Sequence, residues 1–356
     1  MKTRVKHGDV SPIVDRVTLT KTGSMQTVFF FRKANAPWHH SIEELFETII
    51  NALPVSVTPV RYIMKRNSTG LWNRMINTID AAFHQGDVNH ITGDVHYIAL
   101  FLRKHKTILT IHDLRILTSG GRLKKAVIRF FWFTMPARRV RYISVISEFI
   151  KAELMALTAI PASKIRVVYD CIAPEIVPVP REFNAVEPVI LQIGTTPNKN
   201  LHRVIPALEG MNITLVIIGK LSAEQETLLS NHHIRHRNYY NLPYAEVLDH
   251  YRNADLILFA STYEGFGLPI LEANAIGRPV IAGNNTALPE VAGDGALLVD
   301  AESIDSIRSA VMRIISEPEL RSGLIARGFE NVKRFHPRTI GEQFATLYEE
   351  ILSEKR

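Results

Sequence analysis

The chain has 356 residues, of which 46% are hydrophobic and 22% charged, as is ordinary for a soluble globular protein. This composition excludes a disordered, collagen-like or low-complexity chain, and no apolar run is long enough to predict a membrane-spanning helix. The net charge of +7 is uneven, because residues 1–170 carry +13 and the remainder −6. A basic first half suggests an anionic partner. The single cysteine, Cys171, cannot form an internal disulfide, so we expect a reducing compartment.

Residues 1–24 have no clear apolar period and no apolar core of the length that a secretory signal needs. We interpret them as a loose extension, native or added. A first α/β domain is expected over residues 25–177, because strand-like runs alternate there with helical stretches, notably 70–85 and 147–157. The predicted strands are 28–31, 57–63, 88–92, 107–111 and 142–146.

Residues 178–188 contain three prolines and few helix signals, which predicts a linker. A second domain follows over 189–336, with helices at 245–253 and 269–276, and a helix within 337–356 is expected to pack back toward the first domain. The predicted fold class is therefore α/β, with two doubly wound, Rossmann-like domains facing each other across a cleft. Ligands of such sheets bind beyond the carboxyl ends of the strands. The predicted strands of the second domain are 189–193, 214–218, 256–260, 280–282 and 296–299.

The sequence G-T-T-P-N-K-N, residues 194–200, lies between a predicted strand and a helix. Gly194 allows close backbone approach, the helix N-terminus offers free N–H groups, and Lys199 adds a full positive charge. Together they form a plausible diphosphate site, although the segment is neither a P-loop nor a dinucleotide fingerprint. The alternative is an ordinary strand-to-helix turn with an exposed lysine.

A second candidate spans residues 264–272, after the strand 256–260. Glu264 lies in a glycine-rich loop and Glu272 is expected in the first turn of the next helix. Two carboxylates around a loop with free N–H groups suit the recognition of neutral polyhydroxyl ligands, since each carboxylate accepts two hydrogen bonds. The alternative makes Glu272 a dipole-stabilising helix residue and Glu264 a turn residue.

The pair Glu264 and Glu272 matches the E-x7-E signature of retaining glycosyltransferases with the GT-B fold. The surrounding sequence resembles glycosyltransferase family 4 from about residue 27 to the C-terminus, strongly in the second domain and moderately in the first. The similar segments are 89–96, 110–114, 145–149, 193–201, 255–256, 264–272, 278–280 and 288–293.

The resemblance implies roles for these residues. Glu272 would bind the ribose hydroxyls of a nucleotide, Glu264 the hydroxyls of the donor sugar, and Lys199 the diphosphate. His112, after the strand 107–111, would face the donor sugar; from its position alone it could equally be a hydrogen-bonded turn residue. Catalytic roles are thus expected for Glu264, His112 and Lys199. The donor-binding residues would be Gly194, Thr195, Asn198, Lys199, Gly265, Phe266, Gly267, Leu268 and Glu272.

The sequence departs from the family in two loops. The family often has an arginine just after the first glycine of the diphosphate loop, where this chain has Thr195, so Lys199 would act with backbone amides alone. The first strand-to-helix loop lacks the glycine pair common near the acceptor. There Asn35, Trp38, His39 and His40 are expected either to shape an acceptor pocket or to pack the loop. Base contacts are expected from a loop containing Arg237, Asn238, Tyr239, Tyr240 and Leu242.

The implied reaction moves a hexose-type sugar from a nucleotide diphosphate to a hydroxyl of a glycan, with retention of the anomeric configuration. The acceptor glycan would be linked to a lipid, as in the assembly of cell-surface polysaccharides. The departing phosphate would deprotonate the acceptor, and Lys199 would stabilise the leaving group. No metal or other cofactor is expected. His232, His233 and His236 could share one helical face, but no Cys, Asp or Glu completes a ligand set. The alternatives are another GT-B activity, such as an epimerase or phosphorylase, or a non-catalytic sugar-nucleotide-binding subunit.

Residues 122–141 interleave basic side chains with Phe130, Phe131, Trp132 and Phe133. This pattern fits an amphipathic face on an anionic bilayer; the alternative is a core-facing helix with a solvated polar side. We therefore expect a cytoplasmic protein, with peripheral attachment to the inner face of the membrane as the outcome of the first interpretation. Nucleic-acid binding is not expected, because no helix-turn-helix, RRM or zinc pattern occurs.

Overall fold

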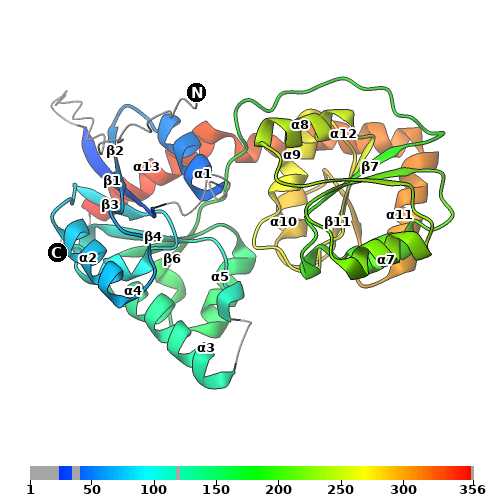
Figure 1. Ribbon diagram of the computed structural model, residues 1–356. Helices are drawn as coiled ribbons and strands as arrows, with labels where there is room; N and C mark the ends of the chain where they lie inside the picture. The colour runs from blue at the N-terminus through cyan, green and yellow to red at the C-terminus, as the bar shows by residue number, and fades with distance from the viewer. Residues whose placement is uncertain (1–23, 34–40, 118–120, 354–356) are drawn as a thin grey trace, which may run out of the picture.

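The computed structural model describes residues 24–33, 41–117 and 121–353 (Figure 1). They form two parallel six-stranded sheets, one in each half of the chain, with helices on both faces of each sheet. Within these ranges, no helix combines the length and the apolar character needed to cross a bilayer. The N-terminal extension falls almost entirely outside the described residues, and the acceptor loop does so completely.

The first sheet has the strand order β2-β1-β3-β4-β5-β6. Each strand predicted in this half is present, although β1 begins three residues earlier than expected and β6 was missed. The strands are β1 (Met25–Phe31), β2 (Val57–Ile63), β3 (Val88–Ile91), β4 (Thr107–Ile111), β5 (Tyr142–Val145) and β6 (Ile165–Val167). The helices are α1 (Ser41–Asn51), α2 (Leu71–Ala82), α3 (Arg122–Ile128), α4 (Met135–Arg138) and α5 (Glu148–Leu157), with a π-helical turn, η4 (Arg129–Thr134), between α3 and α4.

The second sheet has the order β12-β11-β10-β7-β8-β9. Its strands are β7 (Val189–Ile193), β8 (Thr214–Ile218), β9 (His236–Tyr239), β10 (Leu256–Phe259), β11 (Val280–Gly283) and β12 (Leu297–Val299). Its helices are α6 (Leu201–Ala207), α7 (Ala223–Asn231), α8 (Tyr244–Asn253), α9 (Leu268–Ile276), α10 (Leu288–Ala292), α11 (Ile304–Ser316) and α12 (Pro318–Val332).

The strand order of the second sheet decides where a ligand can bind. The chain builds β7, β8 and β9 outward in one direction and then returns to place β10 on the other side of β7. The order therefore reverses between β7 and β10, and the loops after these two strands diverge to opposite faces of the sheet. Such a switch point is the usual ligand site of an open α/β sheet.

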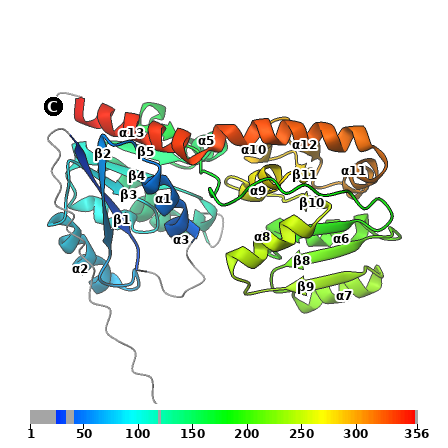
Figure 2. The same cartoon turned by 90° about the horizontal axis from the view of Figure 1, so that it is seen from above.

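The last helix, α13 (Pro337–Ser353), joins the two halves. Figure 2 shows α12 beside the second sheet and α13 continuing along the same edge to the first. There the Tyr348 hydroxyl lies 2.7 Å from Nδ1 of buried His90, whose Nε2 lies 2.7 Å from the Thr110 hydroxyl. Burial lowers the pKa of His90 to about 3. α13 is thus held to the first domain by a buried polar network within an aromatic core.

Candidate functional site

The loop after β7 brings a lysine across a glycine. Gly194 has φ +86°, and a Cβ at this position would lie 2.8 Å from Cε of Lys199, so only glycine lets the lysine lie there. A short 3₁₀ turn over Pro197–Lys199 precedes α6, and left-handed Asn200 separates the two. The buried Asn200 amide donates to the carbonyls of Ala260 and Ala301, which ties this loop to the end of β10.

The two candidate loops meet through an ion pair. Lys199 Nζ lies 2.6 Å from Oε1 of Glu264, and each side chain is 16% exposed. The Asn198 amide donates to the same carboxylate oxygen at 3.3 Å. Lys199 Nζ also lies 4.5 Å from the centre of the Phe259 ring. The residues predicted to hold the diphosphate and the sugar are therefore direct neighbours, and in this state each neutralises the other.

The glycine-rich loop before α9 offers unused backbone donors. Gly267 has φ +129°, and a Cβ there would lie 2.9 Å from the Leu288 side chain. The Phe266 ring is buried, so this residue can serve a ligand only through its backbone. Within the described part of the chain, no acceptor takes the N–H groups of Phe266, Gly267 or Leu268. These donors at the N-terminus of a nine-residue helix suit an anionic or hydroxyl-rich ligand.

Glu272 differs from its prediction in position and surroundings. α9 begins at Leu268, one residue before Pro269, so Glu272 lies beyond the first turn, which holds no acidic residue. Its side chain is buried, and its two oxygens accept hydrogen bonds from the hydroxyls of Tyr244, at 2.6 Å, and Tyr251. Burial raises the pKa of Glu272 above its ordinary value, although the tyrosines oppose this. A helix-dipole role for Glu272 is therefore wrong, and a ligand hydroxyl would have to approach past half-buried Tyr244.

His112 stands at the end of β4, facing the second domain. Its Nε2 lies 2.8 Å from the Thr92 carbonyl, to which it donates, and its Nδ1 lies 3.9 Å from Oδ1 of Asp170. Burial raises the pKa of Asp170 to about 6. The His112 carbonyl approaches Gly265 so closely that a Cβ on this glycine would lie 2.9 Å from it. The predicted histidine thus lies beside the loop that carries Glu264.

Further polar contacts cross between the domains beside this point. The Ser147 hydroxyl donates to the Gly265 carbonyl at 2.7 Å while it also caps the N-terminus of α5. The Glu290 carboxylate, from α10, accepts the N–H of Glu148 at 2.8 Å and the hydroxyl of Tyr169 at 2.9 Å. Sequence reasoning missed Ser147 and Glu290 as site residues, although both lie in segments that it singled out. A glutamate that accepts hydrogen bonds from the N-terminus of a helix in the other domain leaves no pattern in the sequence around it.

Other predicted residues have different surroundings. Asn35, Trp38, His39 and His40 lie outside the described residues. The predicted base-binding residues Arg237, Asn238 and Tyr239 belong to strand β9, not to a loop. The Asn238 amide donates hydrogen bonds to the carbonyls of Ile217 and Gly219. Only Tyr240 and Leu242 remain in the connection to α8. Thr195, at the position where family 4 often has an arginine, donates its hydroxyl to the Lys220 carbonyl.

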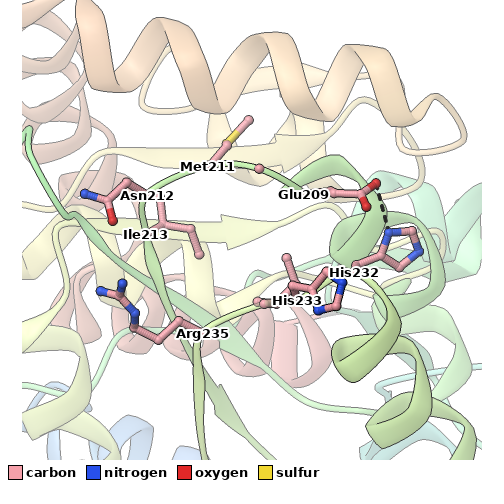
Figure 3. A pocket seen from close by; sticks show the side chains of 9 residues that line it. Glu209, Met211, Asn212, Ile213, His232, His233 and Arg235 are labelled. Carbon is pink, nitrogen blue, oxygen red and sulfur yellow. Dashed lines mark ion pairs between the residues drawn. The ribbon is translucent and has the colours of Figure 1, made fainter.

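The histidines 232, 233 and 236 do not share a helical face. His232 is the cap residue after α7, His233 is left-handed with φ 51°, and His236 begins β9. The first two line a hollow of about 510 Å³, where His232 Nδ1 lies 3.1 Å from Oε2 of Glu209 (Figure 3). This hollow lies at the N-terminal ends of β8 and β9, at the opposite edge of the sheet from Lys199 and Glu264. In the described ranges, no three His, Cys, Asp or Glu side chains are grouped to hold a metal.

Two comparisons with known proteins indicate which enzymes this chain is similar to. Residues 178–331 match the family model described as "Glycosyl transferases group 1". The chain is also 29% identical over 263 residues to the O-antigen chain mannosyltransferase B of Escherichia coli, an alignment that covers 65% of this chain and 67% of the relative. Both findings support a glycosyltransferase of group 1. The matched segment contains Lys199, the loop at Glu264, and Glu272.

Solved structures agree in fold. Anabaena HepE in complex with UDP and glucose superposes with a TM-score of 0.74 at 14% identity, over 92% of this chain and 100% of that one. Sucrose-phosphate synthase from Thermosynechococcus elongatus superposes with a TM-score of 0.72 at 16% identity, over 92% of this chain and 99% of the synthase. The chain therefore has the predicted GT-B fold of two Rossmann-like domains.

Proposed function

We propose that this glycosyltransferase is a member of family 4 that transfers a hexose, with retention of configuration, from a nucleotide diphosphate to a glycan hydroxyl. The observation that carries the proposal is the meeting of Lys199, Glu264 and the free N–H groups of Gly267 and Leu268 at the switch point of the second sheet. A cation and free amides suit a diphosphate, whereas a carboxylate suits sugar hydroxyls. One small region thus has groups for both parts of a nucleotide sugar.

The chemistry follows from the charges. Cleavage of the anomeric carbon–oxygen bond places negative charge on the departing diphosphate, which Lys199 and the amides before α9 would stabilise. To do so, Lys199 must exchange part of its contact with Glu264 for the phosphates. Glu264 is then free to accept hydrogen bonds from sugar hydroxyls. This exchange requires no metal ion, and the departing phosphate would serve as the base toward the acceptor.

The substrate class rests on the curated relative. Because that relative is named an O-antigen chain mannosyltransferase, we propose assembly of an O-antigen-type polysaccharide, with a lipid-linked glycan as acceptor and a mannosyl donor as the first to test. Base recognition would come from the Tyr240–Leu242 region and the groups beside Thr195. A cytoplasmic site of action agrees with a nucleotide-sugar donor.

The test is a thermal-shift panel with UDP, GDP, ADP, CMP and their common sugars. Wild type is compared with Lys199→Met and with a matched control, Lys333→Met, whose exposed lysine pairs only with Glu330 in the described structure. A nucleotide at 100 times its dissociation constant stabilises its protein by about 2.7 kcal/mol. We expect one base to shift wild type and the control, and to shift Lys199→Met much less. If no nucleotide shifts wild type, or if Lys199→Met responds like the control, the donor site is refuted.

A further inference from the structure

Helix α2 is amphipathic, but it turns its polar face toward the protein and its apolar face toward the solvent. Its face toward the protein carries Asn77 and Thr78, both buried, and the Asn77 amide donates to the Tyr97 hydroxyl at 3.0 Å. Its outer face carries large apolar side chains, which include Leu71 at 84% and Trp72 at 73% exposure. Water-exposed helices normally show the opposite pattern. The exposed apolar residues on α2 and at its end are Leu71, Trp72, Met75, Ile76, Ile79 and Phe83.

The segment after β4 has a second exposed apolar row. Leu123 on α3 is 80% exposed, and Phe130 and Phe131 on the π-helical turn η4 are 46% and 54% exposed, whereas Phe133 is buried. The wider π turn presents two neighbouring phenylalanines outward and returns the chain to the core within three residues. The sequence left open whether this segment faces the core or an outer partner. In the structure Phe133 faces the core, whereas Phe130 and Phe131 face outward.

The two rows lie on neighbouring elements of the first domain, and together we call them the α2–α3 face. It consists of the six α2 residues above together with Leu123, Val127, Phe130 and Phe131. The Arg74 guanidinium, on α2, lies 4.8 Å from the centre of the Trp132 ring on η4, so the two elements are in contact. Figure 1 shows α2, α4 and α3 along the lower edge of the first domain.

The charge around this face selects its partner. Residues 114–147 contain eight Lys and Arg and not one Asp or Glu. We propose that the α2–α3 face docks on a lipid bilayer with anionic headgroups, the apolar side chains entering the interface and the basic ones contacting the phosphates. A second copy of the chain fits less well, because symmetric pairing would bring two basic surfaces together.

The position of the face connects it to the site. The Trp132 carbonyl on η4 lies 2.8 Å from Nδ1 of His96, just beyond the loop after β3. In that loop, a Cβ on Gly93 would lie 3.1 Å from Cδ2 of His112. A bilayer on the α2–α3 face would thus lie on the side of the first domain that carries His112, whose carbonyl approaches Gly265. Delivery of a lipid-linked acceptor there rests on the proposed function, but bilayer binding itself does not.

The experiment is vesicle co-sedimentation of the full chain. Vesicles of phosphatidylcholine alone are compared with vesicles containing 30% phosphatidylglycerol, at low and high salt. The variants are Trp72→Ala/Phe131→Ala and Lys124→Glu/Lys125→Glu. Their controls are Val186→Ala/Met312→Ala, which removes exposed apolar side chains of the second half, and Lys220→Glu/Lys333→Glu. All eight positions are at least partly exposed, so folding should survive, and circular dichroism checks it.

We expect wild type and both controls to bind anionic vesicles, with binding lost at high salt, and each α2–α3 variant to bind roughly tenfold more weakly or worse. The fluorescence of wild type should shift to the blue on binding, and Trp72→Ala should reduce this shift. Equal binding to neutral and anionic vesicles, no binding to either, or variants that bind like wild type would overturn the proposal. The nucleotide panel is independent: failure there with vesicle binding intact would refute only the proposed function.

Discussion

His90 offers a quantitative test of how α13 is held to the first domain. Its ring is fully buried between the hydroxyls of Tyr348 and Thr110, and burial lowers its pKa from 6.5 to about 3. A neutral histidine in the folded state and a titrating one in the unfolded state make stability depend on pH. The perturbation we propose is His90→Gln, with the exposed His105→Gln as control.

The sign follows from proton binding. Below pH 6.5 the unfolded chain binds a proton that folded His90 does not, so its contribution to the free energy of unfolding falls as the pH falls, until both forms are protonated near pH 3. Each unit of pKa difference corresponds to 1.36 kcal/mol, so the full effect is about 5 kcal/mol. Between pH 7 and pH 5 the expected loss is about 2 kcal/mol. His96, which is also buried with a lowered pKa, adds to the wild-type loss but cancels in the comparison.

The assay is urea unfolding at pH 7, 6 and 5, followed by circular dichroism. We expect His90→Gln to be less stable than wild type at pH 7, since Tyr348 and Thr110 lose a partner, but to lose about 2 kcal/mol less between pH 7 and pH 5. His105→Gln should follow wild type. If wild type and His90→Gln lose stability equally over this range, His90 is not a buried neutral residue in solution and the reasoning is refuted.

Three further predictions concern the site. Glu264→Gln should bind a nucleotide diphosphate at least as tightly as wild type, because a negative charge leaves the phosphate surroundings, while transfer falls roughly 100-fold; calorimetric titration and a transfer assay check this, and weaker diphosphate binding would contradict it. Gly265→Ala places a Cβ 2.9 Å from the His112 carbonyl and should separate the loop from the first domain. Its transfer rate should fall roughly tenfold or more with little change in melting temperature, whereas Gly121→Ala, with open space around the added atom, should keep wild-type activity. Tyr251→Phe removes a donor to buried Glu272 and should cost about 1–3 kcal/mol at pH 7 in urea unfolding. Because burial already raises the pKa of Glu272, this cost should shrink as the pH falls and the carboxyl takes up a proton; a cost independent of pH would contradict the raised pKa.

Much of the site could be predicted because its signals are local. Gly194 directly follows the largely apolar strand β7, with Lys199 five residues later, and Glu264 lies in the glycine-rich loop that follows the apolar strand β10. A buried parallel strand and a loop at its carboxyl end are both visible within a window of about ten residues. Glu290 and Ser147 carry no such signal, since their roles depend on partners more than 100 positions away in the sequence.

By itself, the sequence determined every described strand except β6 and β9, several of the helices and the chemical character of the loops, because side-chain periodicity and glycine or proline placement act over a few neighbouring residues. The tertiary structure alone decided that β10 lies beside β7, which brings Glu264 to 2.6 Å from Lys199. It also decided that Glu272 is enclosed by two tyrosines and that α2 turns its apolar face outward. Strand order and burial depend on contacts between distant segments, and these contacts are set by the packing of the whole chain, not by any one of its windows.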